Sequence, residues 1–92
     1  MTTLKTTAQF RKDYKLAKKR GLNLALLEDV IQTLLEEKPL DPKYRDHELT
    51  GNYAGFRECH IQPDWLLIYE VDSDLPMLTA ARTGTHSDLF KK

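Results

Sequence analysis

The residues best suited to chemistry are concentrated in residues 46–65 of this 92-residue chain. This stretch contains two of the three histidines, the only tryptophan, and a Pro-Asp pair with the composition of a tight turn. An arginine and the third histidine follow near the end of the chain. The candidate functional residues are His47, His60, Asp64, Trp65, Arg82 and His86.

These residue types are the components that RNA cleavage needs. Histidine titrates near neutral pH and serves as general acid or base, and aspartate can accept a proton or orient an imidazole. Arginine presents a planar set of donors to phosphate oxygens, and tryptophan can stack on a nucleobase, a contact worth about 1–3 kcal/mol. In this reaction a base removes the 2′-hydroxyl proton, the oxygen attacks the adjacent phosphate, and an acid protonates the leaving 5′-oxygen. The reaction requires no metal ion.

Three strands are predicted in the second half of the chain. Polar and apolar residues alternate over residues 56–61, which places Glu58 and His60 on one face of that strand. Residues 65–71 are rich in β-formers and apolar on both faces, as in a central strand. Residues 77–82 form the third strand after a second turn. Short turns between these strands predict an antiparallel meander.

The meander predicts where the candidate residues meet. The end of its first strand, the start of its second and the end of its third lie at one edge of the sheet. The third histidine begins close to that edge, and the first can fold over it from the segment before the meander. The residues predicted to converge are His60, Asp64, Trp65, Arg82 and His86, with His47 as a further member.

Two helices are predicted before the strands. After a short opening strand, a capping box beginning at Thr6 starts a helix that Gly21 ends. Asn23 can cap a second amphipathic helix, which Pro39 ends, and residues 40–55 are irregular. A last helical turn follows the third strand. The order β-α-α-β-β-β predicts an α+β fold, with a meander sheet packed against two N-terminal helices.

Composition limits the class of protein. A chain of this length forms one domain, residues 1–92, and 40% hydrophobic with 30% charged residues is typical of a soluble globular protein. The single cysteine cannot form an internal disulfide, and no apolar run approaches the roughly 20 residues that span a membrane. We therefore expect a cytoplasmic protein that does not contact a membrane.

A net charge of zero conceals an uneven distribution. Residues 1–20 contain seven basic side chains and one acidic side chain, whereas residues 21–76 contain four basic and twelve acidic ones. This pattern fits a basic surface for a polyanion, or a basic helix that attracts an acidic one.

Other interpretations of the candidate residues remain. A metal centre could use the histidines, but these lie 13 and 26 residues apart, and an arginine beside them would repel a cation. A catalytic thiol at Cys59 would lie on the strand face opposite His60. We therefore expect no metal and no cofactor. Ordinary structural roles are also available: Trp65 in a core, Asp64 in a turn, and Arg82 in an ion pair.

Several stretches resemble the YafQ branch of the RelE-like bacterial toxins, the messenger-RNA interferases of type II toxin–antitoxin pairs. The likeness includes the order of elements and extends over nearly the whole chain. The matching stretches are Asp46-His47-x-Leu49-x-Gly51, Gly55-Phe56-Arg57-Glu58-Cys59-His60-Ile61-x-Pro63-Asp64-Trp65-Leu66-Leu67-Ile68-Tyr69 and Arg82-Thr83-Gly84-Thr85-His86-x-x-Leu89-Phe90.

The resemblance implies a ribosome-dependent endoribonuclease that cuts messenger RNA in the aminoacyl site of the small ribosomal subunit and so inhibits translation. It implies that His86 is the general acid, that Asp64 or His60 is the base or orients it, and that Arg82 binds the phosphate. His47 would assist at the phosphate. The residues expected to shape the messenger-binding surface are Trp65 and Phe90.

The resemblance also implies a cognate antitoxin, in a complex of two toxins and two antitoxins that binds operator DNA through the antitoxin. The basic first helix would grip ribosomal RNA. Its candidate residues are Arg11, Lys12, Lys15, Lys18 and Lys19. The alternatives are a non-enzymatic growth inhibitor of the gyrase-poisoning type on the same fold, and an inactive module that only binds the antitoxin.

Overall fold

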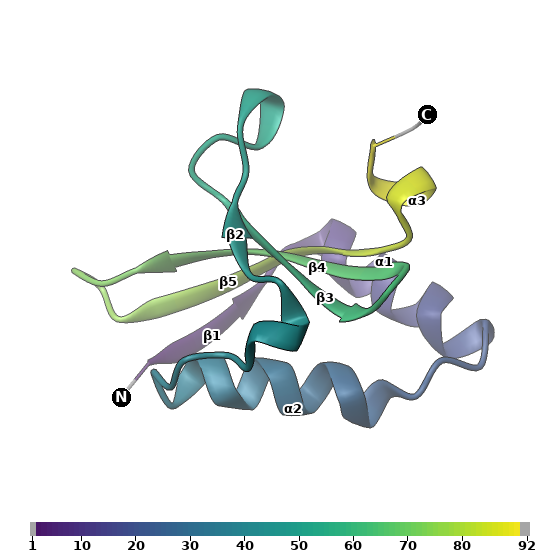
Figure 1. The fold of residues 1–92 in the computed structure, drawn as a ribbon, viewed down its shortest axis with the longest axis horizontal. Helices are drawn as coiled ribbons and strands as arrows, with labels where there is room; N and C mark the ends of the chain where they lie inside the picture. Colours follow the sequence, from purple (N-terminus) through teal and green to yellow (C-terminus); the bar gives the residue numbers. More distant parts are fainter. Residues whose placement is uncertain (1, 91–92) are drawn as a thin grey trace.

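The computed structural model describes residues 2–90 and confirms the predicted α+β fold (Figure 1). Its elements are β1 Thr3–Thr6, α1 Ala8–Lys19, α2 Leu24–Leu35, the 3₁₀ turn η1 Pro42–Tyr44, β2 His47–Glu48, the 3₁₀ turn η2 Gly51–Tyr53, β3 Arg57–Gln62, β4 Trp65–Asp72, β5 Met77–Gly84 and α3 His86–Phe90. The five strands form one sheet in the order β1-β5-β4-β3-β2. As predicted, β3, β4 and β5 form an antiparallel meander, and β1 lies parallel to β5 at one edge.

The opposite edge contains β2, a strand that the sequence pattern did not predict. Residues 40–55 were expected to be irregular, but His47 and Glu48 pair with β3, where His47 lies opposite Glu58. A strand of two residues is too short to show a period-two pattern, so pairing with β3 rather than local sequence defines it.

The helix starts follow capping chemistry, with one correction. α1 is capped by Thr7 rather than Thr6, because the Thr7 hydroxyl accepts from the backbone N–H of Phe10 at 2.9 Å and donates to the carbonyl of Ala81 at 2.7 Å. The bond to β5 is a tertiary contact that no local pattern contains. Asn23 caps α2 as predicted. Among the described residues, no helix is long and apolar enough to cross a membrane.

The central strand β4 is buried on both faces. Trp65, Leu67 and Tyr69 pack in the main core beneath α1 and α2, and Trp65 donates its indole N–H to the Thr83 hydroxyl at 2.9 Å. Leu66 and Ile68 point to the opposite face and are fully buried as well. The sheet therefore needs a cover on each side.

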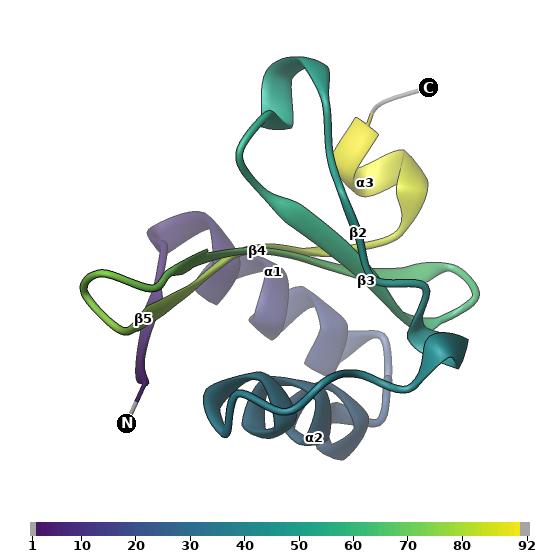
Figure 2. The same cartoon turned by 60° about the vertical axis from the view of Figure 1, so that its left-hand side comes forward.

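A smaller, second core provides the cover on the face away from α1 and α2. Figure 2 shows α3 on the opposite side of the sheet from the two long helices. The buried members of this second core are Leu66, Ile68, Ala81 and Leu89, and the half-buried residues around them are Leu49, Tyr53, Phe56 and Phe90.

The short helix α3 is held in place by Asp88. The Asp88 carboxylate accepts two bonds from the Arg20 guanidinium, at 2.6 and 3.2 Å, and one from the backbone N–H of Thr85 at 3.0 Å. The Thr85 hydroxyl accepts from the Asp88 N–H in return, which completes a capping box. A Cβ atom at Gly84 would lie 2.9 Å from the Asp88 carboxylate, so glycine is needed there.

We predict that Asp88→Asn makes stability less sensitive to acid. The hydrogen bond from Arg20 holds the pKa of the Asp88 carboxyl well below its usual range. The unfolded chain therefore binds more protons there than the folded chain does, and the stabilisation present above about pH 4 is lost as pH falls. Between pH 6 and pH 3, the urea midpoint should fall less for the variant than for the wild type, as measured by Trp65 fluorescence.

The control for this experiment is Asp74→Asn, which changes an exposed aspartate in the β4–β5 turn. It should retain the wild-type acid dependence. An Asp88→Asn variant with the same acid dependence as wild type would show that the Arg20–Asp88 contact contributes nothing to the pH response.

Candidate active site

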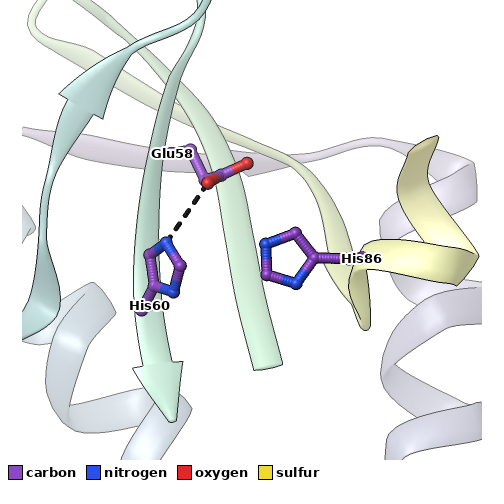
Figure 3. A group of neighbouring side chains, drawn as sticks. All are labelled: Glu58, His60 and His86. Atoms are coloured by element: carbon purple, nitrogen blue, oxygen red, sulfur yellow. Dashed lines mark ion pairs between the residues drawn. The ribbon is translucent and has the colours of Figure 1, made fainter. Parts of the chain in front are cut away.

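Three histidines and two carboxylates meet at one end of the second core. β3 contributes Glu58 and His60 on one face, as predicted, and β2 places His47 opposite Glu58. Figure 3 shows His86 approaching this pair from α3. The ring centroids of His60 and His86 lie 5.7 Å apart, and those of His47 and His60 lie 6.3 Å apart. Asp64 joins the group from the β3–β4 turn, where it contacts His86.

Glu58 is the member of the site that sequence reasoning missed. Its side chain is only 6% exposed, and one carboxylate oxygen lies 3.4 Å from His60 Nε2 and 3.6 Å from His47 Nε2. A buried carboxylate between two imidazoles can accept a proton from either ring or stabilise a charged one. The available signal was strand alternation, since a residue two positions before His60 must lie on the same face.

Asp64 orients His86 from the solvent side. Its carboxylate lies 2.9 Å from His86 Nδ1 and also accepts from the His86 backbone N–H at 3.2 Å. These two bonds lower the pKa of the Asp64 carboxyl. Because an ionised carboxylate only accepts, Nδ1 carries the hydrogen, and Nε2 is the nitrogen left to act on another molecule.

His47 is held in a similar way by a backbone carbonyl. Its Nδ1 lies 2.8 Å from the carbonyl oxygen of Arg45, which can only accept. Nε2 therefore points toward Glu58, and the two groups can share a hydrogen bond only when Nε2 carries a proton. The structure therefore brings the three histidines and Asp64 close together, as the strand order predicted.

Arg82 is paired with an aspartate of α1. Its Nε and Nη2 donate to the two carboxylate oxygens of Asp13 on α1, at 3.0 and 3.2 Å. Asp13 is 8% exposed, and it also accepts from the backbone N–H of Thr83. The hydrogen bonds that Arg82 donates to Asp13 raise the pKa of the guanidinium. This bidentate pair ties α1 to β5, and the phosphate-binding role that the resemblance implies for Arg82 stays a prediction.

Trp65 also departs from its expected role. It is 2% exposed and lies within the main core, so neither ring face is open to a nucleobase. The second expected surface residue, Phe90, is half-buried and adjoins the site, with its ring centroid 6.4 Å from that of His86 and 5.7 Å from that of Tyr53. The aromatic surface next to the histidines is therefore formed by the second core.

The basic residues of α1 are exposed, but α1 covers the sheet face opposite to the site (Figure 2). The residues concerned are Arg11, Lys12, Lys15, Lys18 and Lys19. They form a surface separate from the histidines, with Arg11 bonded to Thr6 at the start of the helix.

One subset of the site has the composition of a metal centre. Glu58, His60 and His86 each offer one ligand atom, and these atoms lie within 4.8 Å of one another. Three such ligands with an open position are typical of catalytic zinc sites. The expectation of no metal considered only histidines and an aspartate, and it did not include the Glu58-x-His60 pair.

Comparisons with known proteins agree with the resemblance seen in the sequence. A family described as a bacterial toxin of type II toxin–antitoxin systems, YafQ, matches residues 2–91. The mRNA interferase toxin YafQ of Escherichia coli K12 is 41% identical over 85 residues, which cover 91% of this chain and 90% of that protein.

Solved structures match the fold closely. A metal-bound toxin from Helicobacter pylori is 46% identical, with a TM-score of 0.92 over 98% of this chain and 100% of that one. A toxin chain of the E. coli DinJ–YafQ toxin–antitoxin complex is 38% identical, with a TM-score of 0.88 over 97% of each chain. The chain described here therefore belongs to the YafQ family of bacterial toxins of type II toxin–antitoxin systems.

Proposed function

We propose that this chain is a ribosome-dependent endoribonuclease, which inhibits translation by cutting messenger RNA in the ribosomal A site. The single observation that carries this proposal is the hydrogen bond between Asp64 and His86, together with the distance of 5.7 Å between the ring centroids of His86 and His60. Two imidazoles at this spacing can act on the two oxygens that exchange protons in RNA cleavage. The 41% identity to an mRNA interferase supports the same substrate.

His86 acts as the general acid. Asp64 accepts its Nδ1–H, fixes the ring, and stabilises the positive charge of the imidazolium. Nε2 then donates its proton to the leaving 5′-oxygen. The exposure of this pair, 53% for His86 and 68% for Asp64, leaves the ring open to a strand of RNA.

His60 acts as the general base with the help of Glu58. The Glu58 carboxylate lies 3.4 Å from His60 Nε2 and can stabilise the imidazolium that forms when the ring takes the 2′-hydroxyl proton. The freed 2′-oxygen attacks the adjacent phosphorus, and the bond to the 5′-oxygen breaks. His47, on the other side of Glu58, stabilises charge at the phosphate.

Two further surfaces complete the proposal. Phe90, beside His86, contacts the messenger, and the exposed basic residues of α1 contact ribosomal RNA.

E. coli YafQ forms a toxin–antitoxin complex with DinJ. We infer a corresponding antitoxin for this chain, in an assembly of two toxins and two antitoxins that binds operator DNA through the antitoxin.

We predict that His86→Gln lowers the rate of messenger cleavage on programmed ribosomes by about 100- to 10,000-fold, because glutamine cannot deliver a proton. Glu58→Gln should also slow cleavage, since it removes the charge beside His60. New messenger ends would be mapped and their rate of appearance measured.

All three histidines of the chain lie in the site, so none is available for a control substitution. The urea midpoint of each variant is measured instead, to show that the variant folds. Cleavage by a folded His86→Gln protein at the wild-type rate would exclude the acid role. Growth arrest without new messenger ends would instead indicate a non-enzymatic inhibitor.

The role of metal ions can be tested on the wild-type protein. An H. pylori relative is metal-bound, and Glu58, His60 and His86 could hold an ion in this chain as well. We predict that a chelator selective for transition metals, added while Mg²⁺ is kept high enough to preserve the ribosome, leaves the cleavage rate unchanged. Added Zn²⁺ should inhibit cleavage, because it takes as ligands the imidazoles that move protons. Loss of activity with the chelator, and its recovery with metal, would make the ion part of the catalyst.

A further inference from the structure

A cleft of about 650 Å³ opens directly beside the catalytic group. Its lining includes His60 and His86 together with Lys43, Tyr44 and Arg45. These three residues belong to η1 and its C-terminal cap, a segment that the sequence pattern left as irregular. The cleft therefore connects the reacting imidazoles with a segment that the catalytic mechanism does not use.

The cleft is lined by one lysine and one arginine, Lys43 and Arg45. Lys43 and Arg45 are both exposed, and neither takes part in an ion pair within residues 2–90. By contrast, Arg20, Arg57 and Arg82 are each held by an aspartate. Two unpaired cations along a cleft favour an anionic ligand.

The segment that carries these cations is ordered by local contacts. Asp41 accepts from the backbone N–H of Lys43 at 2.9 Å, and Tyr44 packs against the main core. The Lys43 ammonium lies 5.2 Å from the centre of the Tyr44 ring, a cation–π distance. The Lys43 charge thus lies over the Tyr44 ring, which packing against the main core holds in place at the cleft.

Arg45 links the cleft to the catalytic group through its backbone. It adopts a left-handed conformation, with φ 49° and ψ 44°, which is uncommon for a residue with a long side chain. Such a conformation persists where surrounding contacts stabilise it. In this conformation the Arg45 carbonyl accepts from His47 Nδ1, so the position of the segment and that of the histidine are coupled.

We propose that this cleft binds the messenger strand next to the bond that is cut, with Lys43 and Arg45 on its phosphates. The inference rests on the proposed function and adds a substrate-binding site to it. Phosphate contacts carry no sequence information, so the cleft contributes affinity and register rather than codon preference. It lies apart from the basic face of α1, which we assign to ribosomal RNA.

The test compares Lys43→Gln/Arg45→Asn with wild type in single-turnover cleavage on programmed ribosomes. Asparagine tolerates the left-handed conformation better than most residues, so the backbone at position 45 is preserved. The toxin concentration for half-maximal rate should rise about tenfold, with the saturating rate within twofold of wild type. The slope of log affinity against log salt should fall by about 1.4, or 0.7 for each lost phosphate contact.

The matched control is Lys5→Gln/Lys38→Gln, which removes two exposed lysines that do not line the cleft. This variant should behave as wild type. If the saturating rate of the cleft variant falls while its half-maximal concentration is unchanged, the segment acts only by positioning His47, and the proposal is wrong. Wild-type kinetics in the cleft variant would overturn it as well, whereas a wild type that does not cleave would refute the proposed function itself.

A second arm separates messenger from ribosomal RNA as the source of the phosphates. Binding is measured in a His86→Gln background, with and without the two cleft substitutions, to ribosomes whose messenger either spans the A site or ends before it. The cleft substitutions should weaken binding only where messenger spans the A site. Equal weakening on both ribosomes would place the contact on ribosomal RNA and contradict the proposal.

Discussion

Burial of β4 on both faces is the constraint on which the structure depends. Residues 65–69 are each at most 2% exposed, so the sheet must be covered twice. The helices α1 and α2 cover one face, and α3 with the loop around η2 covers the other. That second cover brings His86 from the end of the chain to β3, where it meets Glu58 and His60. The site is thus assembled by the same packing that closes the second core.

Some charged side chains form ion pairs that hold elements of the fold together, and others have no such partner among the described residues. Asp88 fixes α3 through Arg20, and Asp13 fixes α1 to β5 through Arg82. The third pair, between Asp46 and Arg57, is joined by the Tyr69 hydroxyl, which donates to Asp46 at 2.6 Å, and burial raises the pKa of that tyrosine. Lys43 and Arg45 have no such partner among the described residues and line the cleft beside His60 and His86, whereas the unpaired basic residues of α1 lie over the opposite face of the sheet.

Much of this arrangement could be predicted from periodicity. Strand alternation places Glu58 and His60 on one face, and antiparallel connection brings the strand ends to one edge. Two expected roles differ from the observed surroundings, and only the second could have been foreseen from the pattern. Arg82 pairs with Asp13, 69 residues earlier, and no spacing rule links such distant residues. Trp65 begins a strand that is apolar on both faces, and this pattern favours burial over the stacking role that we had expected.

The chemistry of the cut ends tests the central claim most directly. Attack by the 2′-oxygen, with His86 as acid, predicts a 2′,3′-cyclic phosphate on the upstream fragment and a free 5′-hydroxyl on the downstream one. These ends can be distinguished by mass spectrometry of a short messenger cleaved on the ribosome. An upstream fragment ending in a 3′-hydroxyl, with a 5′-phosphate downstream, would mean that water attacks the phosphorus, and it would contradict this account.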